Sequence, residues 1–96
     1  MPRFVIERDI PDAGSMEREE LRGASAKSND VLAEMRAERK NILWEQSYVA
    51  DDKIFCVYIA DDETLIREHA DRSGFPATIV TQMRKRIDPT TADEAA

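Results

Sequence analysis

The alternation of apolar and polar residues along this chain predicts four strands and two helices. Apolar residues recur every three or four positions over 15–38 and again between Asp61 and Gly74, which is helical spacing. Short runs with the two-residue period or the residue types of strands lie at 3–9, 42–50, 53–60 and 77–87. The elements therefore follow the order strand–helix–strand–strand–helix–strand.

Residues with known capping preferences mark the ends of both predicted helices. Ser15 is placed to cap the first helix, and Asp61 or Asp62 to cap the second. Gly74 is the expected residue after the second helix, and Pro76 prevents that helix from continuing. Both helices should thus have defined ends.

This order of elements predicts an α+β domain of the ferredoxin-like class, an antiparallel four-stranded sheet with both helices on one face. The other face of the sheet would be bare in a monomer, so we expect a homodimer that covers it. Residues 1–88 should form this single domain. Residues 89–96 have little to bury and should form a flexible tail.

The turn at residues 51–52 suggests a register for the central hairpin. If Ala50 lies opposite Lys53, then Ser47 faces Cys56, and Glu45 faces Tyr58. Strand alternation then predicts an apolar set packed under the helices, which comprises Phe4, Ile6, Trp44, Gln46, Tyr48, Phe55, Val57 and Ile59. It predicts a mixed polar set on the opposite face, comprising Glu7, Leu43, Glu45, Ser47, Cys56 and Tyr58. A slip of one residue would exchange the two sets.

Composition narrows the classes of function. The net charge is −6, and acidic and basic residues are mixed along the 96-residue chain, which argues against nucleic-acid binding. The sequence has neither a signal-peptide pattern nor an apolar stretch of membrane-spanning length, so we expect a cytoplasmic protein without a membrane partner. The single cysteine, Cys56, excludes an intrachain disulfide and fits a reducing compartment.

Two side chains carry the candidate chemistry. His69 is the sole histidine and lies on the apolar face of the second helix, where a core residue, a metal ligand and a general base are all open interpretations. Cys56 lies in the middle of a strand, where we expect a buried, slowly reacting thiol. The sequence lacks a glycine-rich phosphate loop, a CxxC pair and an HExxH motif, so it does not indicate an enzyme.

Five blocks of sequence resemble a family of short bacterial proteins of the nickel-binding type, long known as a domain of unknown function. The blocks are WEQSYV (44–49), DKIFCVY (52–58), IREHA (66–70), GFPA (74–77) and DPTT (88–91). The resemblance covers nearly the whole chain. It implies a ferredoxin-like fold, a dimer and the binding of nickel or another divalent metal.

The resemblance makes His69 the principal candidate ligand for that metal, with Glu68 and Glu45 as carboxylate candidates. His69 has no strong ligand one turn away on its helix, where Leu65, Ile66, Arg72 and Ser73 lie. Family members often carry a histidine at the position of Gln46, which removes a second imidazole here. We therefore expect a weak, non-catalytic site completed by water or by a second subunit.

The alternative is a small cofactor-free enzyme or ligand-binding protein of the dimeric α+β barrel kind. Its pocket would lie between the helices and the sheet, with Trp44, Gln46, Tyr48 and His69 as lining candidates for a small molecule. A structural or regulatory dimer is a third possibility. An exposed His69 among carboxylates would favour the metal, and an apolar cavity beside His69 would favour the pocket.

Overall fold

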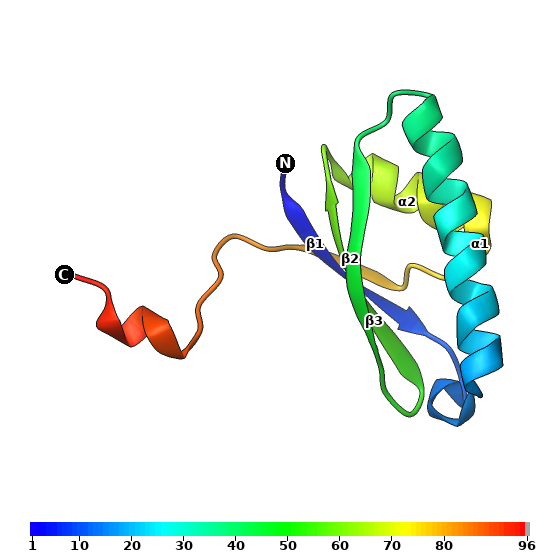
Figure 1. Ribbon diagram of the computed structural model, residues 1–96, viewed down its shortest axis with the longest axis horizontal. Helices are drawn as coiled ribbons and strands as arrows, with labels where there is room; N and C mark the ends of the chain where they lie inside the picture. The colour runs from blue at the N-terminus through cyan, green and yellow to red at the C-terminus, as the bar shows by residue number, and fades with distance from the viewer. Residues whose placement is uncertain (96) are drawn as a thin grey trace.

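One four-stranded antiparallel sheet forms the centre of the protein, in the order β2–β3–β1–β4. The computed structural model describes residues 1–95. Its strands are β1 (Arg3–Asp9), β2 (Ile42–Val49), β3 (Lys53–Ala60) and β4 (Ile79–Gln82). Helices α1 (Arg18–Ala37) and α2 (Glu63–Ser73) both lie against one face of the sheet (Figure 1), which confirms the predicted ferredoxin-like arrangement.

The helix ends follow capping chemistry, with one difference from the sequence. Asp62 caps α2 by accepting a hydrogen bond from the Leu65 N–H at 3.3 Å, and Gly74 ends it at a φ of 80°. The first helix begins at Arg18 rather than at residue 15, because Ser15 belongs to a short 3-10 turn, η1 (Ala13–Ser15). The residue that caps α1 is instead Glu17, in a reciprocal capping box with Glu20.

Strand β4 is shorter than the predicted 77–87 because its pairing partner ends. Phe4 pairs with Gln82, and the Met83 N–H donates to the Arg3 carbonyl at 2.8 Å. Beyond Met83 no residue of β1 remains to pair with. The chain then leaves the body of the molecule and ends in a short helix, η2 (Pro89–Asp93), which stands apart from the domain (Figure 1). The flexibility of residues 89–96 stays a prediction, and residue 96 lies outside the described residues.

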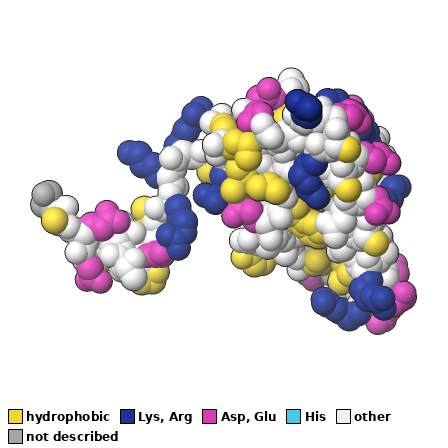
Figure 2. Space-filling view, turned by 45° about the horizontal axis from the view of Figure 1, so that its top comes forward, with side chains coloured by type: hydrophobic (Ala, Val, Ile, Leu, Met, Phe, Trp, Pro, Cys, Tyr) yellow, Lys and Arg dark blue, Asp and Glu magenta, His cyan; other side chains and the backbone are white. Residues whose placement is uncertain are grey.

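The core lies between the sheet and the two helices. Large apolar side chains from every layer are buried there, each contributing roughly 1.5–3 kcal/mol relative to exposure. They are Phe4, Ile6, Leu32, Met35, Ile42 and Ile66. Charged side chains of both signs are interspersed over the surface seen in Figure 2. Neither α1 nor α2 is long and apolar enough to cross a membrane, and no other helix in residues 1–95 is either.

The prediction of which hairpin residues face the helices is largely wrong. Ser47 does lie opposite Cys56, but Phe4 pairs with Tyr58, and residues that pair directly share a face. The buried set under the helices therefore includes Cys56 and Tyr58. The predicted members that lie instead on the open face are Gln46, Tyr48, Phe55, Val57 and Ile59.

A β-bulge explains why Trp44 nevertheless points toward the helices. The register of β2 against β3 shifts between Trp44 and Gln46, so Glu45 is the extra residue. Trp44 consequently lies opposite Tyr58, the position that the hairpin register had assigned to Glu45. This single inserted residue lets Trp44 and Ser47, three positions apart, share one face.

The open face of the sheet carries the apolar surface that we expect a second copy to cover. Tyr48, Leu43 and Ile79 are 61%, 47% and 45% exposed, and Val5 and Val57 are half-buried beside them. Glu7 and Glu45 lie on this face as predicted, whereas Cys56 and Tyr58 do not. A dimer through this face stays a prediction.

We predict that the chain sediments as a dimer at tens of micromolar and that Tyr48→Glu shifts it toward monomer, because a carboxylate would be buried unpaired at the interface. Glu34→Gln, on the exposed side of α1, is the control and should leave the dimer intact. A wild-type protein that sediments as a monomer at these concentrations would contradict the prediction.

Candidate functional site

His69 is turned inward by α2 and lies at the centre of the helix–sheet interface. It is 1% exposed, and its Nε2 lies 3.2 Å from the Ser28 hydroxyl oxygen. Burial, reinforced by the positive charge of Arg8, lowers the pKa of His69 from 6.5 to about 4, so the ring is neutral at pH 7. Among residues 1–95, its Nδ1 is the one buried side-chain nitrogen or oxygen without a hydrogen-bond partner.

The two carboxylates proposed with His69 as metal ligands are engaged elsewhere. Glu68 pairs with Lys40 at 2.7 Å and with Arg72 at 2.5 Å, and these cations lower its pKa. Glu45 pairs with Arg3 at 2.5 Å on the open side of the sheet. The structure therefore does not bring His69, Glu68 and Glu45 together.

The described residues also form no cluster of side chains that could bind nickel elsewhere in the chain. Nickel prefers imidazole and tolerates carboxylate or thiolate ligands. Within residues 1–95, no group of three or more His, Cys, Asp or Glu side chains is arranged to hold a metal ion. The neutral imidazole of His69 is the form that coordinates metals, but it is sealed from solvent. The residues of one chain thus do not fit a closed nickel site.

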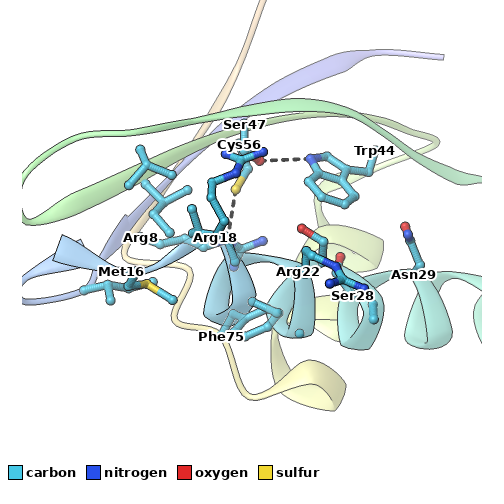
Figure 3. A pocket seen from close by; sticks show the side chains of 18 of the residues that line it. Arg8, Met16, Arg18, Arg22, Ser28, Asn29, Trp44, Ser47, Cys56 and Phe75 are labelled. Carbon is cyan, nitrogen blue, oxygen red and sulfur yellow. Dashed lines mark hydrogen bonds between the residues drawn. The ribbon is translucent and has the colours of Figure 1, made fainter. Parts of the chain in front are cut away.

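A half-open cavity of about 950 Å³ lies between the first half of α1 and the sheet. That volume falls in the range of roughly 300–1,000 Å³ typical of small-molecule sites. Several of the helix residues that face this space are small, among them Ala24, Ser25 and Ser28, and they leave part of it unfilled. Side chains from α1, β1, β2 and β3 surround it, together with Phe75 and Pro76 from the segment after α2 (Figure 3).

The most unusual side chain of the cavity is Arg8, which is only 3% exposed. Its Nε donates to the Cys56 sulfur at 3.3 Å (Figure 3). Its Nη1 donates to the Pro76 carbonyl at 2.9 Å. The rings of Tyr58 and Phe75 each lie with their centroid 5.9 Å from its central carbon. No carboxylate of residues 1–95 lies within 4 Å of the guanidinium, so it is a buried charge without a counter-charge.

Hydroxyl groups connect the cavity wall to His69. The Ser28 hydroxyl lies 3.5 Å from the Tyr58 hydroxyl and 3.2 Å from His69 Nε2. Burial raises the pKa of Tyr58, which keeps its phenol neutral and able to donate. Ser28 and Tyr58 line the cavity, and His69 lies behind them. The histidine therefore supports this wall.

Of the four lining candidates proposed from the sequence, the cavity includes only Trp44, and His69 lies behind its wall. Trp44 lines it, donates its indole N–H to the Ser47 hydroxyl at 2.9 Å, and stacks on Tyr58 with ring centroids 6.5 Å apart. Gln46 and Tyr48 lie on the open face of the sheet, where Nε2 of Gln46 donates to the Tyr48 hydroxyl at 3.4 Å.

Sequence reasoning missed Arg8, Phe75 and Ser28 as pocket residues. A signal for Arg8 exists, because it follows Phe4 and Ile6 at the two-residue period of the buried face of β1.

Comparison with known proteins agrees with this architecture. A family model described as "Nickel responsive protein SCO4226-like" matches residues 4–83. The crystal structure of SCO4226 from Streptomyces coelicolor A3(2) superposes with a TM-score of 0.72 at 15% sequence identity, covering 88% of this chain and 99% of that one. At this identity the structural match shows the fold alone. No curated protein matches the sequence.

Buried His69 predicts a specific loss of stability in acid. Its folded-state pKa of about 4 lies below the ordinary 6.5, so the unfolded chain takes up a proton first as the pH falls. The contribution of His69 is thus complete above about pH 6.5 and is lost between pH 6.5 and 4, by about 3 kcal/mol at most.

The measurement is urea unfolding of wild type and His69→Gln across this range. The difference in unfolding free energy between them should shrink as the pH falls, while the carboxylate titrations common to both proteins cancel. A difference that stays constant from pH 7 to pH 4 would contradict the assignment of a neutral, buried imidazole.

Proposed function

The chain belongs to the family of SCO4226-like nickel responsive proteins, and we propose that it is a non-catalytic binding protein that holds a small organic molecule between α1 and the sheet. The observation that carries this proposal is the cavity of about 950 Å³, with the buried Arg8 in its wall. The family description connects the chain to nickel, which is compatible with metal binding.

The composition of the cavity wall supports a ligand with an apolar body. Trp44, Phe75 and Leu21 supply aromatic and aliphatic surface, and a few polar groups are set among them. This combination, mostly apolar walls with a small number of placed polar groups, is typical of small-molecule sites. The cavity also adjoins the wall that His69 supports, whereas no carboxylate cluster surrounds that histidine. That arrangement favours the pocket over the metal.

Binding fits the positions of the titratable groups better than catalysis does. A general base must come within hydrogen-bond reach of the proton that it removes. His69 does not line the cavity, and the Ser28 hydroxyl occupies its Nε2. Tyr58 is held protonated by burial. These groups are suited to holding a ligand in place.

Divalent-metal binding is the second candidate, and the family description favours it. The free Nδ1 of the neutral His69 ring is the feature that supports it in this chain. Because one imidazole makes a weak site, this candidate needs ligands from water or from a second subunit. It also needs the buried ring of His69 to become accessible.

We predict that octanol, a neutral amphiphile, binds in the cavity and that Ala24→Leu weakens its binding by about tenfold, since the larger side chain occupies the space. Ala24 lines the cavity from α1, and leucine keeps the helix propensity high. The reporter is fluorescence of Trp44, the sole tryptophan, which lines the same cavity.

The matched control is Ala33→Leu, on the exposed side of the same helix. It should bind octanol as the wild type does. Equal binding by Ala24→Leu and Ala33→Leu, or no binding by wild type at millimolar octanol, would reject the proposed cavity function.

A calorimetric titration with nickel separates the two candidates. We predict that wild type binds nickel no tighter than the millimolar range and that His69→Gln matches it within about twofold, because His69 is buried away from carboxylates. Zinc and cobalt serve as comparison metals. Tight nickel binding that disappears in His69→Gln would instead establish the metal candidate, with His69 as its ligand.

A further inference from the structure

Resting on the proposed cavity function, we propose that the ligand carries a carboxylate and that this carboxylate pairs with the guanidinium of Arg8. The positive charge of Arg8 has no acidic partner among residues 1–95. A buried charge is ordinarily paired or coordinated, because its desolvation costs several kcal/mol. Arg8 is buried in the cavity wall, and no acidic side chain of the described chain pairs with it.

The hydrogen bonds of Arg8 leave one edge of the guanidinium free. An arginine side chain carries five N–H donors. Nε uses its one donor on the Cys56 sulfur, and Nη1 uses one of two on the Pro76 carbonyl. The Arg8 side chain also lies near the Tyr58 hydroxyl, and Nη2 donates to no carbonyl or carboxylate within residues 1–95. One remaining N–H of Nη1 and one of Nη2 can donate two parallel hydrogen bonds to the two oxygens of a carboxylate.

The position of this fork is fixed before any ligand arrives. Arg8 projects from β1, the strand between β3 and β4 in the sheet. The Pro76 carbonyl and the Cys56 sulfur hold two of its nitrogens, and the rings of Tyr58 and Phe75 flank it at cation–π distance. A preorganised arginine loses little conformational entropy when it binds an anion.

The charges around the cavity favour an anion, although the whole chain carries a net charge of −6. Arg18 and Arg22 line the cavity from the first turns of α1. The acidic residue beside them, Glu19, is strongly exposed and pairs with Arg22 at 2.9 Å. The guanidinium of Arg8 thus remains as an uncompensated charge at the inner wall, where screening by water is weakest.

A carboxylate fits this site better than a phosphate does. Phosphate sites commonly use several backbone N–H groups at a helix N-terminus. Here Glu17 and Glu20 form a capping box at the N-terminus of α1, which places two carboxylates where a phosphate would bind. A single planar guanidinium flanked by the rings of Tyr58 and Phe75, with Trp44 elsewhere in the same cavity wall, is instead matched to a monocarboxylate with an aliphatic or aromatic body.

The test compares octanoate with octanol, two ligands with the same chain length that differ in the charged group. Calorimetry and Trp44 fluorescence are measured on wild type and on Arg8→Met, which removes the charge and keeps a side chain of similar length. Arg36→Met is the matched control, because it removes one positive charge from an exposed position of α1 that does not line the cavity. Urea unfolding establishes that each variant is folded.

We expect wild type to bind octanoate at least about tenfold more tightly than octanol. Arg8→Met should lose about 10- to 100-fold in octanoate affinity and change by less than about threefold for octanol. Arg36→Met should change by less than about threefold for either ligand. Octyl phosphate should bind more weakly than octanoate to wild type.

Three results would overturn the inference. Wild type could bind octanol as tightly as octanoate, which rejects the carboxylate and leaves the cavity function standing. Arg8→Met could weaken both ligands equally, which makes Arg8 a support of the cavity wall and not a partner of the anion. Binding of neither ligand by wild type would reject the proposed function itself, and with it the inference.

Discussion

The pairing of β1 with β3 decides which side chains enter the space under the helices. Residues that pair directly lie on the same face, so Phe4 and Tyr58 are buried together, and so are Ile6 and Cys56. The next inward position on β1 is Arg8, paired with Ile54. The same register that builds the apolar core therefore places a cation in it. A register shifted by one residue would put Arg8 in solvent and would remove the site.

The length and composition of α1 determine what lies over this cation. The second half of the helix fills the interface with Val31, Leu32 and Met35. The first half places small residues such as Ala24, Ser25 and Ser28 among longer side chains, and a cavity remains between it and the sheet. The second half of α1 thus packs the core, and the first half borders the space for a ligand. The buried Ser28 lies at the boundary, where it connects Tyr58 to His69.

Much of this fold was predictable from local sequence signals. Strand periodicity, the cap at Asp62 and the helix end at Gly74 each depend on residues that are close together in the sequence. The faces of the hairpin were not predictable in the same way. Strand β3 is apolar on both faces, so hydrophobicity does not distinguish Cys56 and Tyr58 from Phe55 and Val57. Only the long-range pairing with β1 does.

The candidate site was predictable only in part. Trp44 and an inward-facing His69 were foreseen, whereas the bulge at Glu45 has no clear local signature. A basic residue near the end of a strand usually extends into solvent, which is why Arg8 did not stand out. The family resemblance correctly indicated the fold and a family described as nickel responsive. It also directed attention to Glu68 and Glu45, which the structure places in surface ion pairs away from His69.

The proposed class of ligand depends on one interaction, in which the buried guanidinium of Arg8 pairs with the carboxylate of a bound ligand. A crystal structure of the protein grown with octanoate tests it most directly. The account predicts octanoate in the cavity, with its carboxylate oxygens about 2.7–2.9 Å from Nη1 and Nη2 of Arg8 and its alkyl chain against Trp44. A cavity filled by the chain's own side chains, or an Arg8 paired with a carboxylate of the protein itself, would contradict it.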